Sequence, residues 1–489
     1  MLINLGFIKL NKTPILMAAL SLLFYWVFAY DLIRTDYIKL VTLYTALFFF
    51  FYKLIHLLKH DVKTLSYLAF IFRAVFILAI PNLSQDFYRF IWDGRMILEG
   101  YNPYLYTVES FIDQGHSPVT QTQELYNGMG ALNASHFTNY PPINQLCFVI
   151  AGVFAGKSIL GSVMIMRLLI IAADFGTLHF GKKLLEKLGL PTYIIFWYLL
   201  NPFIIIELTG NLHFEGVMIC FLIWSLYWLY IGKWPWAAVV LALSVSVKLI
   251  PLIFLPLFFQ WFIKNRSDKQ SQKKSDGLPH HNVNGIQNRA SKGFMKLIGF
   301  YAIIGFTSLL LFSPFYSSEF INNYSKTVAL WFQNFEFNAS LYYIAREIGY
   351  LFRGYNEIEV IGKIIPIVVI LFVLSITFFR KNKTPVQLIT AMLIVLSFYY
   401  FTATTIHPWY IATLLILSVF TKYKFPLIWS FVIILSYLAY INLNKADKSE
   451  NLWIIALEYI FVYGVFFWEV FKKKSSQKGS FNKTINSVF

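Results

Sequence analysis

The stretch SQDFYRFIWDGRMILEGYNPYLY, residues 84–106, is the first long polar break in a chain that otherwise consists of successive apolar runs. Its first half interleaves carboxylates and guanidiniums with aromatic side chains. In a helix, Asp86, Arg89 and Asp93 would share one face, because residues three, four and seven positions apart are neighbours there. We therefore expect a short amphipathic helix at a membrane surface, with its charges facing a shared pocket. A solvated interfacial helix braced by a salt bridge is the alternative.

The rest of the chain has the composition of a membrane protein. Of its 489 residues, 58% are hydrophobic and only 13% are charged, about half the charge of a soluble protein. Its apolar runs approach the length of about 20 residues that a helix needs to cross a bilayer. We predict an all-α, polytopic membrane protein with about 14 transmembrane helices and short interfacial helices in its first large outer loop.

The net charge of +17 does not indicate nucleic-acid binding, because most Lys and Arg lie in short loops between apolar runs. There they set the orientation of the chain in the membrane. Cys147 and Cys220 both lie in apolar runs, which favours core packing over a disulfide or a metal site. The sequence has no zinc-ligand spacing, P-loop or GxGxxG motif, so we expect no cofactor and no metal.

Basic loops give the predicted topology. The first spans are expected at 13–33 (an uncleaved anchor), 39–58 and 64–81, with basic residues before the first and between the second and third. Three crossings from the cytoplasm place residues 82–142 outside. Counting back from Lys472-Lys473-Lys474 also places the C-terminus inside. Both termini are therefore expected to be cytoplasmic, which in a bacterium would make the chain a multi-pass inner-membrane protein.

Composition also predicts the domain organisation. The polar, basic segment 264–295 is expected to be a flexible cytoplasmic linker. It separates an N-terminal membrane module, 1–263, from a C-terminal one, 296–489, which carries an outer loop at 314–360.

The number of apolar stretches between residues 143 and 209 does not fit the predicted topology. Three apolar stretches occur where an even number of crossings is needed. Either one stretch is partial or re-entrant, or Asn201-Pro202 divides the last into two short pieces. Both are tolerated where a broken helix lines a cavity.

Further polar signals fall on the same predicted face as Asp86. His213 and Glu215 lie at the mouth of a span, and Lys248 interrupts an apolar run. Asn338 and His407 occur in later outer segments. Each of these residues also has a structural explanation. Lys248 could extend its ammonium group to the membrane interface, and His213 and Glu215 could form a local pair. His407 could be an interfacial residue beside a tryptophan, and Asn338 could belong to an unused Asn-Ala-Ser glycosylation acceptor.

The central stretch resembles the first-loop motif of GT-C integral-membrane glycosyltransferases, above all bacterial polyprenol-phosphate-mannose-dependent mannosyltransferases. The matching elements are Asp86, Arg89-Phe90, Trp92-Asp93-Gly94-Arg95 and Gly100-Tyr101-Asn102-Pro103-Tyr104. An Asn-Pro break, Gly-Asn-x-His-x-acid, Lys-x-x-Pro and His-Pro-Trp-Tyr extend the resemblance to about residue 410. Phe90 replaces the usual Tyr, and Glu215 replaces the more common Asp.

The resemblance implies a donor in which a hexose, preferably mannose, is joined to a polyprenyl phosphate. It also implies a glycan or glycolipid hydroxyl as acceptor. The acceptor needs a positioned carboxylate to take its proton, for which we predict Asp86, with Asp93 second. The departing phosphate needs cationic and hydrogen-bonding groups, and a further set of side chains suits contacts to the sugar or the prenyl chain. The predicted substrate-binding residues are Arg89, Arg95, His213, Glu215, Lys248, His407, Trp92, Tyr104 and Asn338.

Two other functions compete with this one. The chain could transfer a different lipid-linked sugar, such as aminoarabinose or galactose, to lipid A or protein. It could instead be a flippase for lipid-linked glycans, but a flippase should carry polar residues along a path through the membrane. Here they gather in the predicted outer loops, which favours a surface-facing active site.

Overall fold

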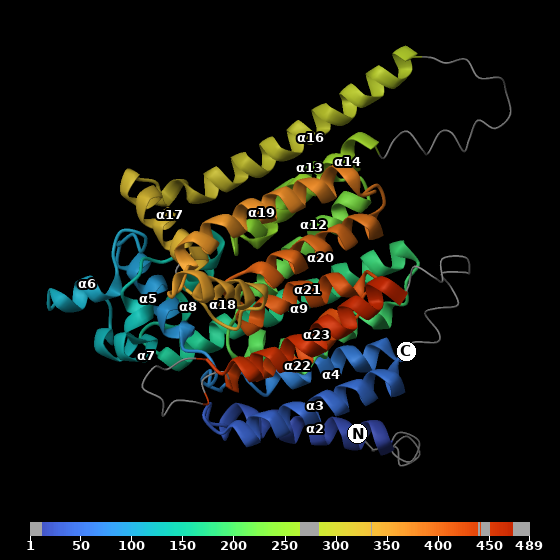
Figure 1. Cartoon of the computed structure of the whole chain (residues 1–489). Helices are drawn as coiled ribbons and strands as arrows, with labels where there is room; N and C mark the ends of the chain where they lie inside the picture. Colours follow the sequence, from blue (N-terminus) through green and yellow to red (C-terminus); the bar gives the residue numbers. More distant parts are fainter. Residues whose placement is uncertain (1–11, 265–282, 334, 439–440, 442–449, 473–489) are drawn as a thin grey trace.

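The computed structural model describes residues 12–264, 283–333, 335–438, 441 and 450–472. Within these ranges every secondary structure element is helical, apart from an isolated bridge between Phe337 and Thr405. Most helices run along one common direction and form an elongated bundle (Figure 1). The all-helical prediction is confirmed.

Seven helices in the described ranges are long and apolar enough to cross a membrane. They are α2 (Lys12–Tyr30), α3 (Tyr37–Leu58), α9 (Ile159–Leu188), α16 (Val283–Phe312), α19 (Ile358–Phe379), α20 (Pro385–Thr402) and α23 (Leu452–Lys472). The chain is therefore an integral membrane protein.

Shorter apolar helices pack among them, in part as α-helix and in part as 3-10 helix. They are α4 (Val62–Ala74), α8 (Pro142–Ala155), α12 (Glu215–Tyr230), α13 (Trp234–Val245), η3 (Ile250–Leu257), α14 (Phe258–Lys264), η5 (Pro408–Tyr410), α21 (Ile411–Val419), α22 (Phe425–Val432) and η6 (Ile433–Leu438). The total of about 14 crossings stays a prediction.

The segment around Asn201-Pro202 is broken at that dipeptide, as a divided or a re-entrant segment requires, and the number of crossings between residues 143 and 209 stays a prediction. Before the break lie η1 (Thr192–Ile195) and α10 (Phe196–Leu199); after it lie α11 (Pro202–Ile204) and the π-helix η2 (Ile205–Gly210). The two halves are bent by 51°. A break and a π-turn free backbone carbonyls, which need hydrogen-bond donors when they are buried.

Two buried arginines supply those donors. Arg73 of α4 donates to the Leu199 carbonyl, where α10 ends, and pairs with Asp174 of α9 at 2.7 Å. Arg167 of α9 donates to the carbonyls of Thr209 and Gly210 at the end of η2. Charges buried among apolar helices are costly unless paired or hydrogen-bonded. These contacts therefore fix α4 and α9 to the broken segment.

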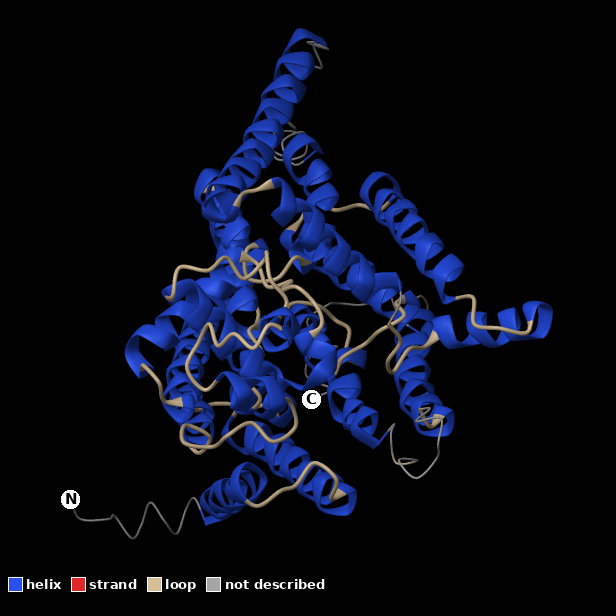
Figure 2. Cartoon of the chain, turned by 90° about the vertical axis from the view of Figure 1, so that its left-hand side faces the viewer, coloured by secondary structure: helices blue, strands red, loops and turns tan. Residues whose placement is uncertain are grey.

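Short helices gather at one end of the bundle, on the left in Figure 1 and facing the viewer in Figure 2. They are α5 (Asp86–Leu98), α6 (Val108–Asp113), α7 (Thr122–Ala134), η4 (Ser313–Phe315), α17 (Ser318–Gln333) and α18 (Leu341–Arg353). The described chain begins at Lys12 and ends at Lys472 at the opposite end of the bundle (Figure 1).

The predicted helix after Ser84 is α5, which packs between α7 and α8. Its approach to α8 is close enough to require glycine: a Cβ at Gly94 would lie 2.4 Å from the Phe148 carbonyl oxygen. The helix ends at Leu98, and Gly100 follows with a φ of +83°, a conformation that favours glycine. Gly94 thus holds α5, and the motif that it carries, against the ends of the longer helices.

Part of the predicted linker 264–295 falls outside the described residues, namely 265–282. From Val283 onward the chain is already helix α16. The boundaries of the two membrane modules stay predictions.

Candidate active site

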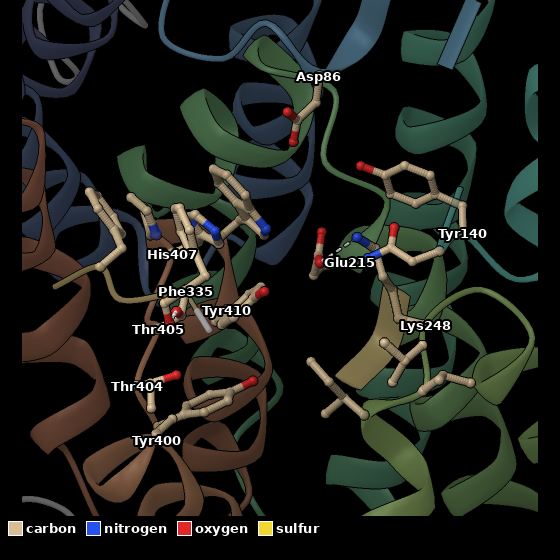
Figure 3. Close-up of a pocket in the computed structure, with 18 of the residues that line it drawn as sticks. Asp86, Tyr140, Glu215, Lys248, Phe335, Tyr400, Thr404, Thr405, His407 and Tyr410 are labelled. Atoms are coloured by element: carbon tan, nitrogen blue, oxygen red, sulfur yellow. Dashed lines mark hydrogen bonds and ion pairs between the residues drawn. The ribbon is translucent and has the colours of Figure 1, made fainter. Parts of the chain in front are cut away.

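A cavity of about 750 Å³ lies where α5 meets the ends of the longer helices (Figure 3). Most of its wall comes from four segments far apart in the chain, within residues 83–89, 132–141, 248–253 and 399–410, and from part of α19. Five of the predicted site residues line it: Asp86, Arg89, Glu215, Lys248 and His407. Folding thus brings together polar signals that are more than 300 residues apart in sequence.

Asp86 is the first residue of α5, and its half-buried carboxylate faces the cavity (Figure 3). The Asn133 side-chain amide of α7 lies 3.4 Å from its Oδ1. Burial raises the pKa of Asp86, whereas the charges of Lys248 and Arg34 and the Asn133 hydrogen bond oppose that rise. In its ionised form the group can accept a proton from a molecule in the cavity.

Arg89 pairs with Asp93 rather than with Asp86. Its Nε lies 2.8 Å from Asp93 Oδ1, and its Nη1 donates to the carbonyls of Asn133 and His136. Asp93 is fully buried and also accepts a hydrogen bond from Gln145. The salt bridge that braces this helix is therefore Arg89–Asp93: Arg89 joins α5 to the end of α7 and leaves Asp86 facing the cavity.

Four other predicted residues lie outside the cavity wall and make structural contacts. Trp92 is buried, with its indole nitrogen 2.9 Å from Met96 Sδ, and Tyr104 donates to the Tyr140 carbonyl. Arg95 donates to the carbonyls of Thr120 and Lys157. Asn338 is buried against the Glu458 carboxylate. Their assignment as substrate-binding residues stays a prediction, and these contacts give each of them a role in packing.

Lys248 and Glu215 form an ion pair on one wall of the cavity, with Nζ and Oε1 3.2 Å apart (Figure 3). Glu215 is fully buried at the N-terminus of α12, while Lys248 is partly exposed to the cavity. Lys248 also lies over the Tyr140 ring, 4.9 Å from its centroid. The cation is thus held at a fixed place by a carboxylate and an aromatic face.

His407, Trp409 and His213 form a continuous stack. The ring centroids of His407 and Trp409 are 4.6 Å apart, and those of Trp409 and His213 are 3.6 Å apart. Burial lowers the pKa of His407 to about 3, and Lys248 and Arg34 act in the same direction. At neutral pH His407 is therefore uncharged and can hydrogen-bond to a ligand.

His213 lies behind Trp409, outside the cavity wall. Burial also lowers its pKa, and the nearby Lys248 and His407 add to that effect. The local His213–Glu215 pair given as a structural alternative is not the contact observed, because the Nε2 of His213 lies 3.8 Å from Glu207. Glu207 in turn accepts a hydrogen bond from Tyr437, which lines the cavity.

Sequence reasoning missed Glu207, Arg34, Tyr437 and Asn133. A carboxylate within the apolar run FIIIELTG is a signal of the same kind as Lys248 and could have identified Glu207. Arg34 could have been found because it lies in an outer loop of the predicted topology. Tyr437 and Asn133 carry no local signal, since only tertiary contacts bring them to the cavity.

No three His, Cys, Asp or Glu side chains in the described ranges come together as a metal site would require. We therefore assign no residue the role of a metal ligand, and the absence of a metal stays a prediction.

Comparison with known proteins identifies the family. Residues 12–264, just over half of the chain, match the family described as alpha-(1->6)-mannopyranosyltransferase, N-terminal domain. The chain belongs to this family. This confirms the resemblance to mannosyltransferases that the first-loop motif carried, and the matched region contains Asp86, Glu215 and Lys248.

Two curated relatives bear the name alpha-(1->6)-mannopyranosyltransferase A. The protein of Mycobacterium tuberculosis is 22% identical over 192 residues, which are 39% of this chain and 35% of the relative. That of Corynebacterium glutamicum is 22% identical over 230 residues, 44% of each chain. The aligned stretch thus spans less than half the length of either relative.

Proposed function

We propose that the chain transfers a hexose, mannose for preference, from a polyprenyl-phosphate donor to a hydroxyl of a glycan or glycolipid acceptor. Asp86 is the base. The observation that carries this proposal is the half-buried Asp86 carboxylate on a cavity that also holds Lys248, in a chain of a mannosyltransferase family. The reaction class follows the family, and the roles of the residues follow the geometry.

The cavity has two kinds of wall, as such a donor would require. Asp86, Glu215 and Lys248 provide charged and hydrogen-bonding groups for a sugar phosphate. Isoleucines of η3 and apolar residues of the candidate span α19 provide the remaining wall. An apolar surface continuous with a membrane helix suits a prenyl chain that enters from the bilayer.

The reaction needs one proton transfer. The acceptor oxygen attacks the anomeric carbon of the donor while the bond from that carbon to the phosphate oxygen breaks. Asp86 takes the proton of the acceptor hydroxyl, and Lys248 offsets the charge that develops on the leaving phosphate. Direct displacement inverts the anomeric centre, so a β-linked donor gives an α-linked product.

The membrane arrangement is part of the proposal. Asp86 faces the extracytoplasmic side of a bacterial inner membrane, both termini are cytoplasmic, and the shorter apolar helices complete about 14 crossings. The gathering of α5, α6 and α7 at the end of the bundle opposite Lys12 and Lys472 supports this topology (Figure 1).

The purified protein in detergent tests the donor class directly. It would be incubated with radiolabelled polyprenyl-phosphate-mannose, the corresponding galactose donor, or a nucleotide-linked mannose, and with a pool of glycolipid acceptors. The proposal predicts transfer from the first donor and release of the label by α-mannosidase. Transfer from the nucleotide sugar alone would refute the lipid-linked donor, and transfer from the galactose lipid alone would refute the sugar.

A further inference from the structure

Arg34 reaches the cavity from the loop between α2 and α3. It lines the same cavity as Asp86 and Lys248. Its guanidinium carbon lies 5.7 Å from the centroid of the Tyr437 ring, and the Tyr437 hydroxyl donates to Glu207 at 2.8 Å. An aromatic face fixed by a buried carboxylate thus orients a cation that comes from a different part of the chain.

The acidic residues nearest to Arg34 in sequence have other partners. Asp31 pairs with Lys39 at 2.6 Å, and Asp36 caps α3 by accepting a hydrogen bond from the Lys39 backbone nitrogen. In the described part of the chain no carboxylate lies within ion-pair distance of Arg34. Arg34 is also an exposed residue, so it can take an anionic ligand without first breaking an ion pair.

The other basic side chains among the predicted substrate-binding residues are paired, lie outside the cavity wall or are uncharged. Arg89 is bound to Asp93 and two carbonyls, and Arg95 lies outside the cavity wall. His407 is uncharged at neutral pH because its pKa is low. Lys248 faces the cavity but already has Glu215 as a partner. Arg34 therefore adds to the cavity a positive charge that no carboxylate in the described part of the chain pairs with.

We propose that Arg34 binds the phosphate of the lipid-linked donor, together with Lys248. This inference rests on the proposed function. Arginine presents a planar fork of N–H donors that matches two phosphate oxygens, which a lysine ammonium cannot do. Asp86 lines the same cavity and would then face the sugar.

The charge on the ligand changes during the reaction, which makes a specific prediction. The donor is a phosphodiester with one negative charge, whereas the released prenyl phosphate is a monoester that carries more charge near pH 7. Arg34 should consequently bind the released phosphate more strongly than the donor. Its loss should weaken binding of a prenyl phosphate monoester and lower kcat, with a smaller effect on donor KM.

Direct binding tests this without an activity assay. Citronellyl phosphate, a short prenyl phosphate, would be titrated into the detergent-purified full chain, with citronellol and inorganic phosphate as separate ligands. Wild type would be compared with Arg34→Ala, Arg34→Lys and the control Lys39→Ala, which removes a cation close in sequence that lies outside the cavity wall. Thermal unfolding would establish that each variant is folded.

We expect Arg34→Ala to bind citronellyl phosphate about 10- to 100-fold more weakly, Arg34→Lys to fall between the two, and Lys39→Ala to match wild type. Equal binding by wild type and Arg34→Ala would overturn the role of Arg34 and leave the proposed function standing. Failure of wild type to bind citronellyl phosphate would overturn the donor class itself, and the inference with it. If Arg34→Ala weakened the binding of citronellol as much as that of citronellyl phosphate, Arg34 would contact the prenyl chain, and phosphate binding by Arg34 would be refuted.

Discussion

Gly94→Ala tests whether the contact between α5 and α8 positions Asp86. A Cβ at Gly94 would lie 2.4 Å from the Phe148 carbonyl oxygen and 2.6 Å from its carbonyl carbon. Because these atoms are backbone, no change of side-chain rotamer can relieve the overlap. Reaching the 3.0 Å that real Cβ contacts require would move α5 by at least about 0.6 Å, and Asp86 is on the same helix.

Two effects follow from that movement. Overpacking of this kind costs about 1–3 kcal/mol of stability. A misplacement of about 1 Å near the reacting atoms costs about a hundredfold in rate, so a shift somewhat below 1 Å should lower transfer about tenfold or more. The assay is the initial rate of mannose transfer from polyprenyl-phosphate-mannose in detergent, measured together with the thermal unfolding temperature.

Gly305→Ala is the matched control, because a Cβ there would meet nothing within 4 Å and the residue lies on helix α16. It should leave both rate and unfolding temperature close to those of wild type. If Gly94→Ala transferred mannose at the wild-type rate and unfolded at the wild-type temperature, then α5 would not pack on α8 as described. A second change, Phe148→Ala, should not rescue Gly94→Ala, because the carbonyl remains.

Three further predictions concern charges. Lys248→Met should lower the transfer rate at least about tenfold, since it removes a cation worth about 1.5–3 kcal/mol to a charged ligand. Lys363→Met, which breaks an exposed ion pair, should transfer at the wild-type rate. Equal rates for the two variants would exclude Lys248 from binding the phosphate. Asp93→Asn should lower stability by about 3 kcal/mol because it leaves Arg89 without its buried partner, and an unchanged unfolding temperature would contradict that. Burial raises the pKa of Asp86, and a protonated Asp86 cannot act as a base. The value of kcat/KM should therefore fall as the pH decreases, with a midpoint above the usual aspartate pKa of about 3.9. Full activity at about pH 4 would contradict this prediction.

Local patterns were sufficient to predict the helical class, the helix that begins at Asp86 and the break at Asn201-Pro202. Each depends on short-range chemistry: apolar run length, i to i+4 spacing, and the missing N–H of proline. The same patterns left the partner of Arg89 open, because Asp86 at i−3 and Asp93 at i+4 are equally allowed on one helix face. Contacts with Asn133 and His136 in the following segment decide in favour of Asp93.

The composition of the cavity could be predicted only in part. Glu215, Lys248 and His407 stood out because polar groups in apolar surroundings are rare and costly. Tyr437 belongs to an apolar run and reaches the cavity only through packing, where it contacts Glu207 from more than 200 residues away. Trp92 and Tyr104 looked like stacking surfaces for a sugar, yet both are buried in contacts of their own. Aromatic side chains serve cores and ligand sites equally, and sequence does not distinguish the two.

The central claim is that Asp86 takes the proton of the acceptor. Its most direct test compares wild type, Asp86→Asn and Asp113→Asn in mannose transfer from polyprenyl-phosphate-mannose, with size-exclusion chromatography to verify folding. Asp113 ends α6 and is exposed outside the cavity wall, so its change should have no effect. Removal of a general base typically costs about 10²- to 10⁴-fold, and the account predicts a loss in that range for Asp86→Asn with the protein still folded. Transfer by a folded Asp86→Asn at the rate of Asp113→Asn would contradict it.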